Sequence, residues 1–328
     1  MGKFRVFRIR KDGAGISGRV ELATLDELSA GEVVIKSAYS SVNYKDALAA
    51  NGPAKIISRF PLIGGVDVVG TVESSGDARF KTDDQVLVTG YDMSISHDGG
   101  YAEYVRVPAE WVIPLPETLT AREAMIIGTA GFTAALCIHK MEQNGQTPEQ
   151  GSVVVTGASG GVGSLAIDML SSKGYDVTAL TGKINESDYL LGLGASHIVD
   201  RNMLELSKRP MERPLWAGAI DNVGGGILSW LTKTVQPWGS ITAVGLAGGS
   251  QLETSVMPFI LRGVSLLGIT SAGCPTLLRH KIWQRIATDL RPQKFEQLSV
   301  NEVGLDELNE VFRTMLNGGT KGRTVVRL

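Results

Sequence analysis

A cluster of glycines near the middle of the chain has the spacing needed to hold a pyrophosphate. Gly157, Gly160 and Gly163 follow an apolar run at 152–156 and precede a helical pattern at 164–173. A glycine-rich turn that leads into a helix presents backbone N–H groups to phosphate, with no Cβ atoms in the way. We therefore expect a dinucleotide site here, although the same glycines also suit an ordinary tight turn. The expected contacts come from Ser159, Gly160, Gly161, Val162 and Gly163.

The end of the next expected strand, at residues 176–180, favours a cofactor that carries an extra phosphate. NAD sites place an Asp or Glu there to bind the ribose 2′-hydroxyl. This chain has Thr181, Gly182 and Lys183 instead, and Arg201 follows the strand after that. A hydroxyl and two cations suit a 2′-phosphate, although most surface lysines and arginines are only solvated. The sequence therefore predicts NADPH as the cofactor.

The elements that must position these residues change character along the chain. Runs at 33–40, 66–72 and 85–89 are rich in β-forming residues and bounded by turns, which predicts a compact barrel or sandwich. From Gly151 onward, strand and helix patterns alternate, which predicts an α/β architecture with a doubly wound parallel sheet. The C-terminal part has helical patterns and a final strand at 323–327.

Composition limits the class of protein and its partners. The chain has 328 residues, of which 43% are hydrophobic and 20% charged, with a net charge of -2. This fits a packed protein that has no overall attraction to nucleic acid. Its two cysteines are too few for a disulfide framework or a four-cysteine zinc site. The apolar run at 124–138 is shorter than the about 20 residues of a membrane span. We expect a cytoplasmic protein with no membrane or nucleic-acid partner.

Two dehydrogenase superfamilies use a glycine loop of this kind. Short-chain enzymes need a Tyr-x-x-x-Lys pair, and none of the seven tyrosines here has Lys four residues on. The chain instead resembles the medium-chain dehydrogenase/reductase superfamily over essentially its whole length. Segments that resemble its zinc-free YhdH/YhfP group lie at 41–48, 128–134, 216–221 and 257–262.

The resemblance implies both an architecture and an activity. It implies a GroES-like catalytic domain at 1–122, an NADP-binding Rossmann domain inserted at 123–268, and a return to the catalytic domain at 269–328. It also usually implies a homodimer. Because the group includes acrylyl-CoA reductases, the implied activity is NADPH-dependent reduction of the C=C bond of acrylyl-CoA, a 2-enoyl thioester. The nearest alternative is reduction of a quinone or an α,β-unsaturated ketone. A non-enzymatic NADPH-binding sensor is a third interpretation.

The resemblance also sets the expected chemistry. Zinc enzymes of the superfamily bind their metal through an early Cys and a Gly-His-Glu segment, where this chain has Asn43 and the segment at 65–67. Val66 cannot ligate, so we expect no metal. Reduction of a conjugated C=C bond needs no Lewis acid, because the charge collects on a carbonyl oxygen that hydrogen-bond donors can stabilise.

Residue roles follow from the same resemblance. Tyr44 either donates a proton or packs against the cofactor, and Asn43 and Asp67 organise hydrogen bonds where related enzymes carry zinc. Arg323 either meets a substrate or cofactor anion or forms a surface ion pair. Further cofactor contacts are expected from Leu246, Ile260, Ser271 and Asn317. Residues interpreted as core or sheet-end positions are Met125, Met169, Met257, Cys137, Cys274 and Asp221.

Overall fold

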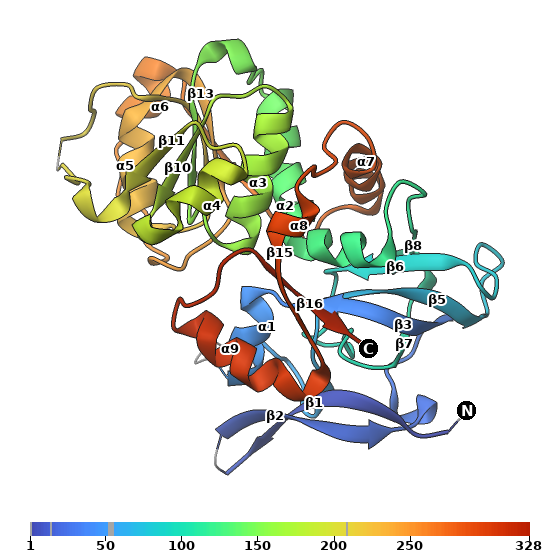
Figure 1. The fold of residues 1–328 in the computed structure, drawn as a ribbon. Coiled ribbons are helices and arrows are strands. Elements are labelled where there is room, and N and C mark those ends of the chain that lie inside the picture. Colours follow the sequence, from blue (N-terminus) through green and yellow to red (C-terminus); the bar gives the residue numbers. More distant parts are fainter. Residues whose placement is uncertain (1, 14, 52–55, 208) are drawn as a thin grey trace. The chain divides into compact units, whose positions relative to one another are not determined.

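The computed structural model describes residues 2–13, 15–51, 56–207 and 209–328, which fold into two compact units (Figure 1). Unit 1 comprises Met1–Thr129, Ala272–Ala287 and Ser299–Leu328, and unit 2 comprises Ala130–Ser271 and Thr288–Leu298. The units differ most from the expected domain boundaries at residues 288–298. This segment belongs to unit 2, although the chain on both sides of it belongs to unit 1. No change in composition marks this short return to unit 2.

Unit 2 contains the parallel sheet that the alternating strand and helix patterns predict. Its strands run in the order β11-β10-β9-β12-β13-β14, and each neighbouring pair is parallel. In chain order this is 3-2-1-4-5-6, the arrangement of a dinucleotide-binding Rossmann fold. The strands are β9 (Val153–Thr156), β10 (Val177–Thr181), β11 (His197–Asp200), β12 (Trp216–Asp221), β13 (Val235–Ala243) and β14 (Ser265–Gly268).

Helices cover both faces of this sheet, as the doubly wound expectation requires. Figure 1 shows α3 and α4 on one side of the strands, with α5 and α6 on the other. Apolar side chains of α5 pack with Val154, Ala219 and Ile241 from the strands, because the strands are buried on both faces and need a cover on each. The helices are α3 (Gly161–Ser172), α4 (Ser187–Gly192), α5 (Gly225–Thr234), α6 (Met257–Arg262) and α8 (Phe295–Leu298).

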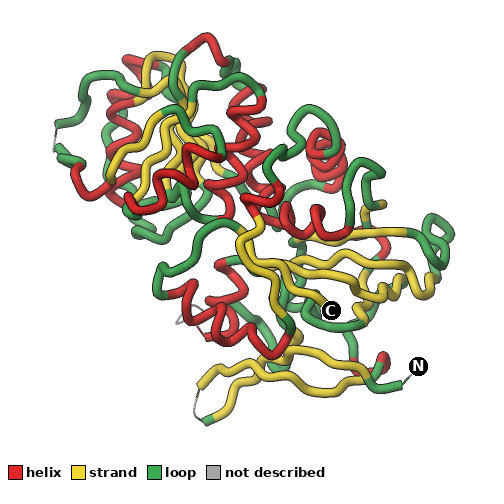
Figure 2. Tube along the Cα trace, in the orientation of Figure 1, coloured by secondary structure: helices red, strands yellow, loops and turns green. Residues whose placement is uncertain are grey.

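Unit 1 is rich in strands and loops, as Figure 2 shows, and it confirms the β-rich expectation for the first part of the chain. One sheet has the order β15-β16-β3-β5-β6-β8 with β7 also paired to β3, and another has the order β2-β1-β4. The strands are β1 (Phe4–Asp12), β2 (Gly15–Ala23), β3 (Val33–Ser41), β4 (Leu62–Ile63), β5 (Asp67–Ser75), β6 (Gln85–Thr89), β7 (Tyr104–Val107), β8 (Ile113–Pro114), β15 (Ser299–Val303) and β16 (Arg323–Arg327). Its helices include α1 (Tyr44–Asn51), α7 (Thr276–Ile286) and α9 (Leu308–Leu316).

Helix α2 (Ala121–Gln143) is the element that the apolar run at 124–138 predicts, but it is longer than expected. Its 23 residues are enough to cross a membrane by length and composition, so the length argument against a span was wrong. The 18-residue apolar window is 89% buried inside the structure, which is typical of the core helix of a soluble protein. Thr120 and Glu123 cap its N-terminus reciprocally, since each side chain bonds the other residue's backbone N–H.

Gly128 interrupts α2 with a backbone conformation that other residues avoid. Its φ is 47° and its ψ is -154°, outside the helical region. A Cβ atom here would lie 2.6 Å from Ser41 Oγ, 2.7 Å from Asp67 Oδ2 and 3.0 Å from Arg323 Nη2. The break in α2 therefore lets the backbone approach a buried polar cluster that a side chain would displace.

We expect Gly128→Ala to lower the free energy of unfolding by about 2–4 kcal/mol, because backbone strain and steric overlap act together. Gly318→Ala is the matched control in unit 1, with a φ of 71° but nothing within 4 Å of the added Cβ. The control should lose only about 1 kcal/mol, from strain alone. Urea denaturation of both variants measures the difference, and equal losses would contradict the steric account.

Candidate active site

The glycine loop lies between β9 and α3, with the geometry that a pyrophosphate requires. α3 begins at Gly161, and its N-cap residue is Gly160, which makes no side-chain capping bond. The first N–H groups of a helix lack intrahelical partners and attract anions. A Cβ on Gly163 would lie 2.5 Å from the Gly157 carbonyl oxygen, so only glycine allows the loop to fold this tightly against the helix.

Hydrogen bonds join β9 to β12 at the point where the strand order reverses. The Thr156 hydroxyl donates to Asp221 Oδ1 over 2.7 Å, and the Asn222 side chain donates to the Thr156 carbonyl oxygen over 2.8 Å. Asp221 is buried at the end of β12, in agreement with its interpretation as a sheet-end residue. Open sheets of this kind bind ligands beside the carboxyl ends of the strands at this reversal. The glycine loop starts there.

Two basic residues, Lys183 and Arg201, follow the ends of the neighbouring strands β10 and β11. Thr181 and Asp200 are paired in the parallel register, so Lys183 and Arg201 follow neighbouring strands at the same edge of the sheet. The Arg201 guanidinium lies against Gly182, where an added Cβ would be 2.8 Å from Nη2. The buried Thr181 hydroxyl accepts the backbone N–H of Lys183 over 3.0 Å, so it orders the turn that carries the lysine.

The remaining residues expected near the cofactor in unit 2 are more dispersed. Leu246 is exposed, with its Cα 3.2 Å from where a Cβ on Gly224 would lie, just after β12. Ile260 is 71% exposed on α6, and Ser271 follows β14. Their contacts with a cofactor stay predictions. Met257, interpreted as a core residue, is 37% exposed on α6, so that interpretation was wrong.

In unit 1, the fully buried Asp67 carboxylate is surrounded by hydrogen-bond donors from two segments, the end of β3 and the break in α2. Ser41 Oγ, Asn43 Nδ2 and the Thr129 backbone N–H donate to Oδ2 over 2.6, 2.7 and 2.9 Å. The Thr129 hydroxyl donates to Oδ1 over 2.6 Å. The structure therefore brings Asn43 and Asp67 together, as expected, and adds Ser41 and Thr129.

Arg323 is buried, so its interpretation as a surface ion pair was wrong. Nε donates to the Ile126 carbonyl oxygen over 2.8 Å, and Nη1 donates to that of Val42 over 2.9 Å. Nη1 also reaches Asn43 Oδ1 at 3.3 Å, and Nη2 donates to Ser41 Oγ over 2.8 Å. Antiparallel pairing of β16 with β3 brings Arg323 to the end of β3, where these acceptors lie. We use the name Asp67 cluster for Ser41, Asn43, Asp67, Thr129 and Arg323.

Asp46 lies beside the Asp67 cluster, in the first turn of α1. Its Oδ2 accepts the Asn43 backbone N–H over 2.9 Å. Burial, and then the charge of Asp67, raise the pKa of Asp46 to about 7. Burial and Asp46 also raise the pKa of Tyr101 well above its usual range, so that hydroxyl stays protonated. Tyr101 donates to the Ser41 carbonyl oxygen over 3.1 Å.

Tyr44 and Asn317 lie at helix ends in unit 1. Tyr44 is the first residue of α1, directly after Asn43, and its side chain is 45% exposed. Asn317 follows the last residue of α9 and is exposed. Tyr44 is therefore partly exposed, whereas the preceding residue, Asn43, belongs to the buried Asp67 cluster. Both roles expected of Tyr44, proton donation and packing against the cofactor, stay predictions.

Sequence analysis did not single out Ser41, Thr129, Asp46 or Tyr101 as site residues. Ser41, Asp46 and Thr129 do lie in the segments 41–48 and 128–134 that carried the family resemblance. That resemblance was the available signal, because isolated Ser, Thr and Asp residues have no distinctive spacing. Tyr101 lies outside those segments and gave no signal.

The donor set does not suit a metal ion. Within the part of the chain that the structure describes, no three His, Cys, Asp or Glu side chains gather as ligands. Both Asp67 oxygens already accept hydrogen bonds from uncharged donors, and Asn43 Oδ1 faces the Arg323 guanidinium. A cation placed here would have to displace Arg323.

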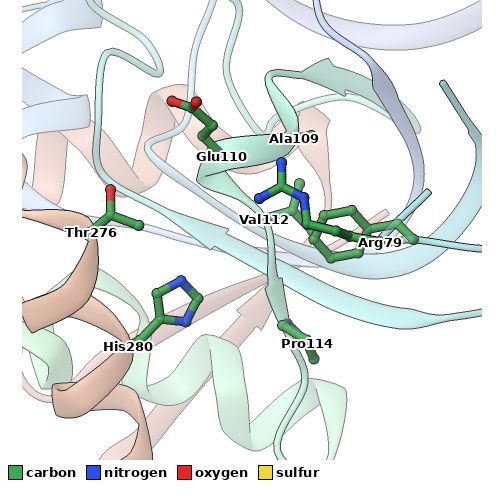
Figure 3. Close-up of a pocket in the computed structure, with 8 residues that line it drawn as sticks. Arg79, Ala109, Glu110, Val112, Pro114, Thr276 and His280 are labelled. Atoms are coloured by element: carbon green, nitrogen blue, oxygen red, sulfur yellow. The ribbon is translucent and has the colours of Figure 1, made fainter. Parts of the chain in front are cut away.

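A hollow of about 500 Å³ lies elsewhere in unit 1 (Figure 3). Arg79 and Glu110 line it together with Thr276 and His280 of α7, over Phe80, Ala109, Val112 and Pro114. Arg79 is already paired with Asp77 over 2.8 Å. None of the residues expected to carry chemistry lines this hollow, so we do not assign the site to it.

Comparisons with known proteins agree with this architecture. The alcohol dehydrogenase GroES-like domain family matches residues 29–117, and the zinc-binding dehydrogenase family matches residues 161–296. The acrylyl-CoA reductase AcuI of Ruegeria pomeroyi is 44% identical, with 94% of this chain and 95% of that protein covered.

YhfP of Bacillus subtilis, whose name assigns it provisionally to the quinone oxidoreductases, is 44% identical over 99% of each chain. Its crystal structure with NAD bound superposes with a TM-score of 0.96 over the whole of both chains. The YhdH oxidoreductase of Salmonella enterica, in complex with NADP, is 43% identical, with a TM-score of 0.95 over 99% of each chain.

The Rossmann strand order, the GroES-like unit and full-length identity above 40% lead to one assignment. The chain belongs to the medium-chain dehydrogenase/reductase superfamily, in the group that contains YhfP and AcuI.

Proposed function

We propose that the protein is an NADPH-dependent reductase of the C=C bond of a 2-enoyl thioester, with acrylyl-CoA as substrate and propanoyl-CoA as product. The observation that carries the choice of cofactor is the pair of cations at the ends of β10 and β11. Identity to AcuI supports the substrate. Unit 2 holds the cofactor in this proposal, and the Asp67 cluster of unit 1 supports the reacting groups.

Lys183 and Arg201 bind the 2′-phosphate in this proposal. The Thr181 hydroxyl orders the Lys183 backbone, and the Arg201 guanidinium lies against Gly182, so both basic residues belong to or adjoin the turn that follows β10. An acid at the end of β10 would repel the phosphate, and Thr181 stands there instead. The carboxylate of Asp200, at the end of β11, accepts a hydrogen bond from the Asn202 backbone N–H over 2.8 Å. Relatives of similar identity carry NADP in one case and NAD in another, so these residues have to make the distinction.

NADPH, when bound, would supply a hydride to the β-carbon of the substrate. The protein then has to stabilise charge on the thioester oxygen and provide a proton for the α-carbon. Tyr44 is a partly exposed tyrosine next to the Asp67 cluster. We propose that its hydroxyl either donates a hydrogen bond to the thioester oxygen or donates the proton to the α-carbon. In the first case, solvent supplies that proton. Asn43, Asp67 and Arg323 position the start of α1 and, through it, Tyr44. No metal takes part in this proposal.

We also propose that the protein works as a homodimer in the cytoplasm, where its two buried cysteine thiols stay reduced. β14 ends the sheet, so its outer edge pairs with no other strand in the described residues. Exposed apolar side chains gather beside it on α6 and at Trp238, which contacts Gly263 at the end of that helix. We name as the α6 patch Trp238, Val256, Met257, Ile260 and Leu261. A two-fold axis would pair β14 with its copy and cover this patch.

Acrylyl-CoA should be reduced with NADPH at a kcat/KM at least tenfold above the values for crotonyl-CoA and for a simple quinone. The measurement is steady-state NADPH oxidation with each acceptor. YhfP makes quinone reduction the competing function. A quinone that matches or exceeds acrylyl-CoA would favour that function and contradict ours.

Lys183→Ala should raise the Kd for NADPH by about tenfold or more and leave that for NADH nearly unchanged, because only NADPH carries the 2′-phosphate. Arg213→Ala removes an equal charge from an exposed position in the loop before β12 and serves as the control. Fluorescence titration with both cofactors measures the change. If Lys183→Ala weakens NADH as much as NADPH, the phosphate assignment is wrong.

Leu261→Glu should shift the protein from dimer to monomer, because it places a charge in the proposed interface. Leu277→Glu changes a more exposed leucine, 87% accessible on α7 of unit 1, and should leave the dimer intact. Sedimentation velocity distinguishes the species. A wild-type monomer, or equal effects of the two variants, would refute the proposed dimer.

A further inference from the structure

Asp46 is a buried acid to which the mechanism above assigns no part. Its side chain is 1% exposed, and its neighbours limit which oxygen can carry a proton. Oδ2 accepts the Asn43 backbone N–H, whereas Oδ1 has no hydrogen-bond partner with ordinary geometry in the described residues. A buried carboxylate oxygen with no donor is costly, so a proton on Oδ1 relieves the burial.

Tyr101 is the group that can accept this proton's hydrogen bond. Its side chain interacts with Asp46, yet its only proton points to the Ser41 carbonyl oxygen over 3.1 Å. The Tyr101 oxygen can still accept a bond. A neutral Asp46 therefore completes a chain in which Asp46 donates to Tyr101 and Tyr101 donates to Ser41.

The charges around Asp46 support the neutral form. From β5, the Asp67 charge disfavours a second carboxylate, and both Asp67 oxygens are occupied by donors. From α1, Lys45 interacts with Asp46 but is itself half-buried, and burial lowers its pKa. From β16, Arg323 directs its hydrogen bonds to Ser41, Asn43 and backbone oxygens. Neither Lys45 nor Arg323 is therefore a committed cation for Asp46.

We propose that Asp46 is a positioning residue, held neutral so that Oδ1–H donates to Tyr101 while Oδ2 holds the Asn43 N–H. Asn43 closes the first turn of α1, since its carbonyl oxygen accepts the N–H groups of Asp46 and Ala47. Asp46 therefore fixes Asn43 through the backbone while Asp67 fixes it through the side chain. Tyr44 comes next in the chain. This inference rests on the proposed function only where it concerns turnover.

Ionisation of Asp46 should disturb this arrangement in a defined pH range. The pKa of about 7 in the folded protein exceeds the ordinary value of 3.8. The folded state therefore binds a proton that the unfolded state releases, and the stability contribution declines from about pH 4 to about pH 7 and is flat above. Above pH 7 a second charge appears beside Asp67, and Tyr101 must divide its single proton between Asp46 and Ser41.

The test compares Asp46→Asn with the wild type in two measurements. Asn keeps the acceptor for the Asn43 N–H and offers an uncharged donor to Tyr101 at every pH. In denaturant unfolding, the wild type should lose stability relative to the variant between pH 4 and pH 7. In turnover, wild-type kcat should fall through a single ionisation near pH 7, and the variant should lack that fall while keeping its KM for NADPH.

Asp168→Asn is the matched control, because Asp168 is also buried, in α3 of unit 2, and burial also raises its pKa. It should change stability with pH and leave the pH dependence of kcat as in the wild type. Identical unfolding profiles for the wild type and Asp46→Asn would overturn the neutral acid. Identical kcat profiles would overturn its positioning role. If the wild type reduces no enoyl thioester, the proposed function fails, and the unfolding comparison still decides whether Asp46 is neutral.

Discussion

The hydrogen bonds that converge on the buried Asp67 carboxylate are the constraint on which unit 1 depends. They join the end of β3, the start of β5 and the break in α2, which are far apart in the sequence. A buried carboxylate is tolerated only when donors satisfy it, so each of these segments has to be in place at once. Gly128 makes this possible because its lack of a side chain leaves room for the cluster.

Unit 2 has a different structural requirement, because the backbone N–H groups at the start of α3 have to stay available to a ligand in our proposal. The tight loop before α3 depends on Gly163, and the reversal of strand order places that loop at the carboxyl edge of the sheet. The cations after β10 and β11 then lie on the neighbouring strands. In our proposal, cofactor binding thus follows from topology, whereas reduction also needs side chains of unit 1 that the buried Asp67 cluster positions.

Local patterns were enough to predict the α/β architecture, the parallel sheet and the glycine turn before α3, because strands, glycines and caps signal their structure over a few residues. The cluster around Asp67 was predicted only in part. Asn43 and Asp67 were expected through family resemblance. For Arg323 the alternatives were a contact with a substrate or cofactor anion and a surface ion pair, and neither anticipates its buried hydrogen bonds to Ser41 and Asn43. Its burial results from the long-range pairing of β16 with β3, which no local pattern encodes. The excursion at 288–298 escaped prediction for the same reason.

The central claim is hydride transfer from NADPH to the β-carbon of an enoyl thioester. The most direct test is to react NADPH that carries deuterium at the transferred position with acrylyl-CoA and to locate the label in the product by NMR. The account predicts propanoyl-CoA with deuterium on its β-carbon and none on its α-carbon. Deuterium on the α-carbon, or unlabelled product, would contradict it.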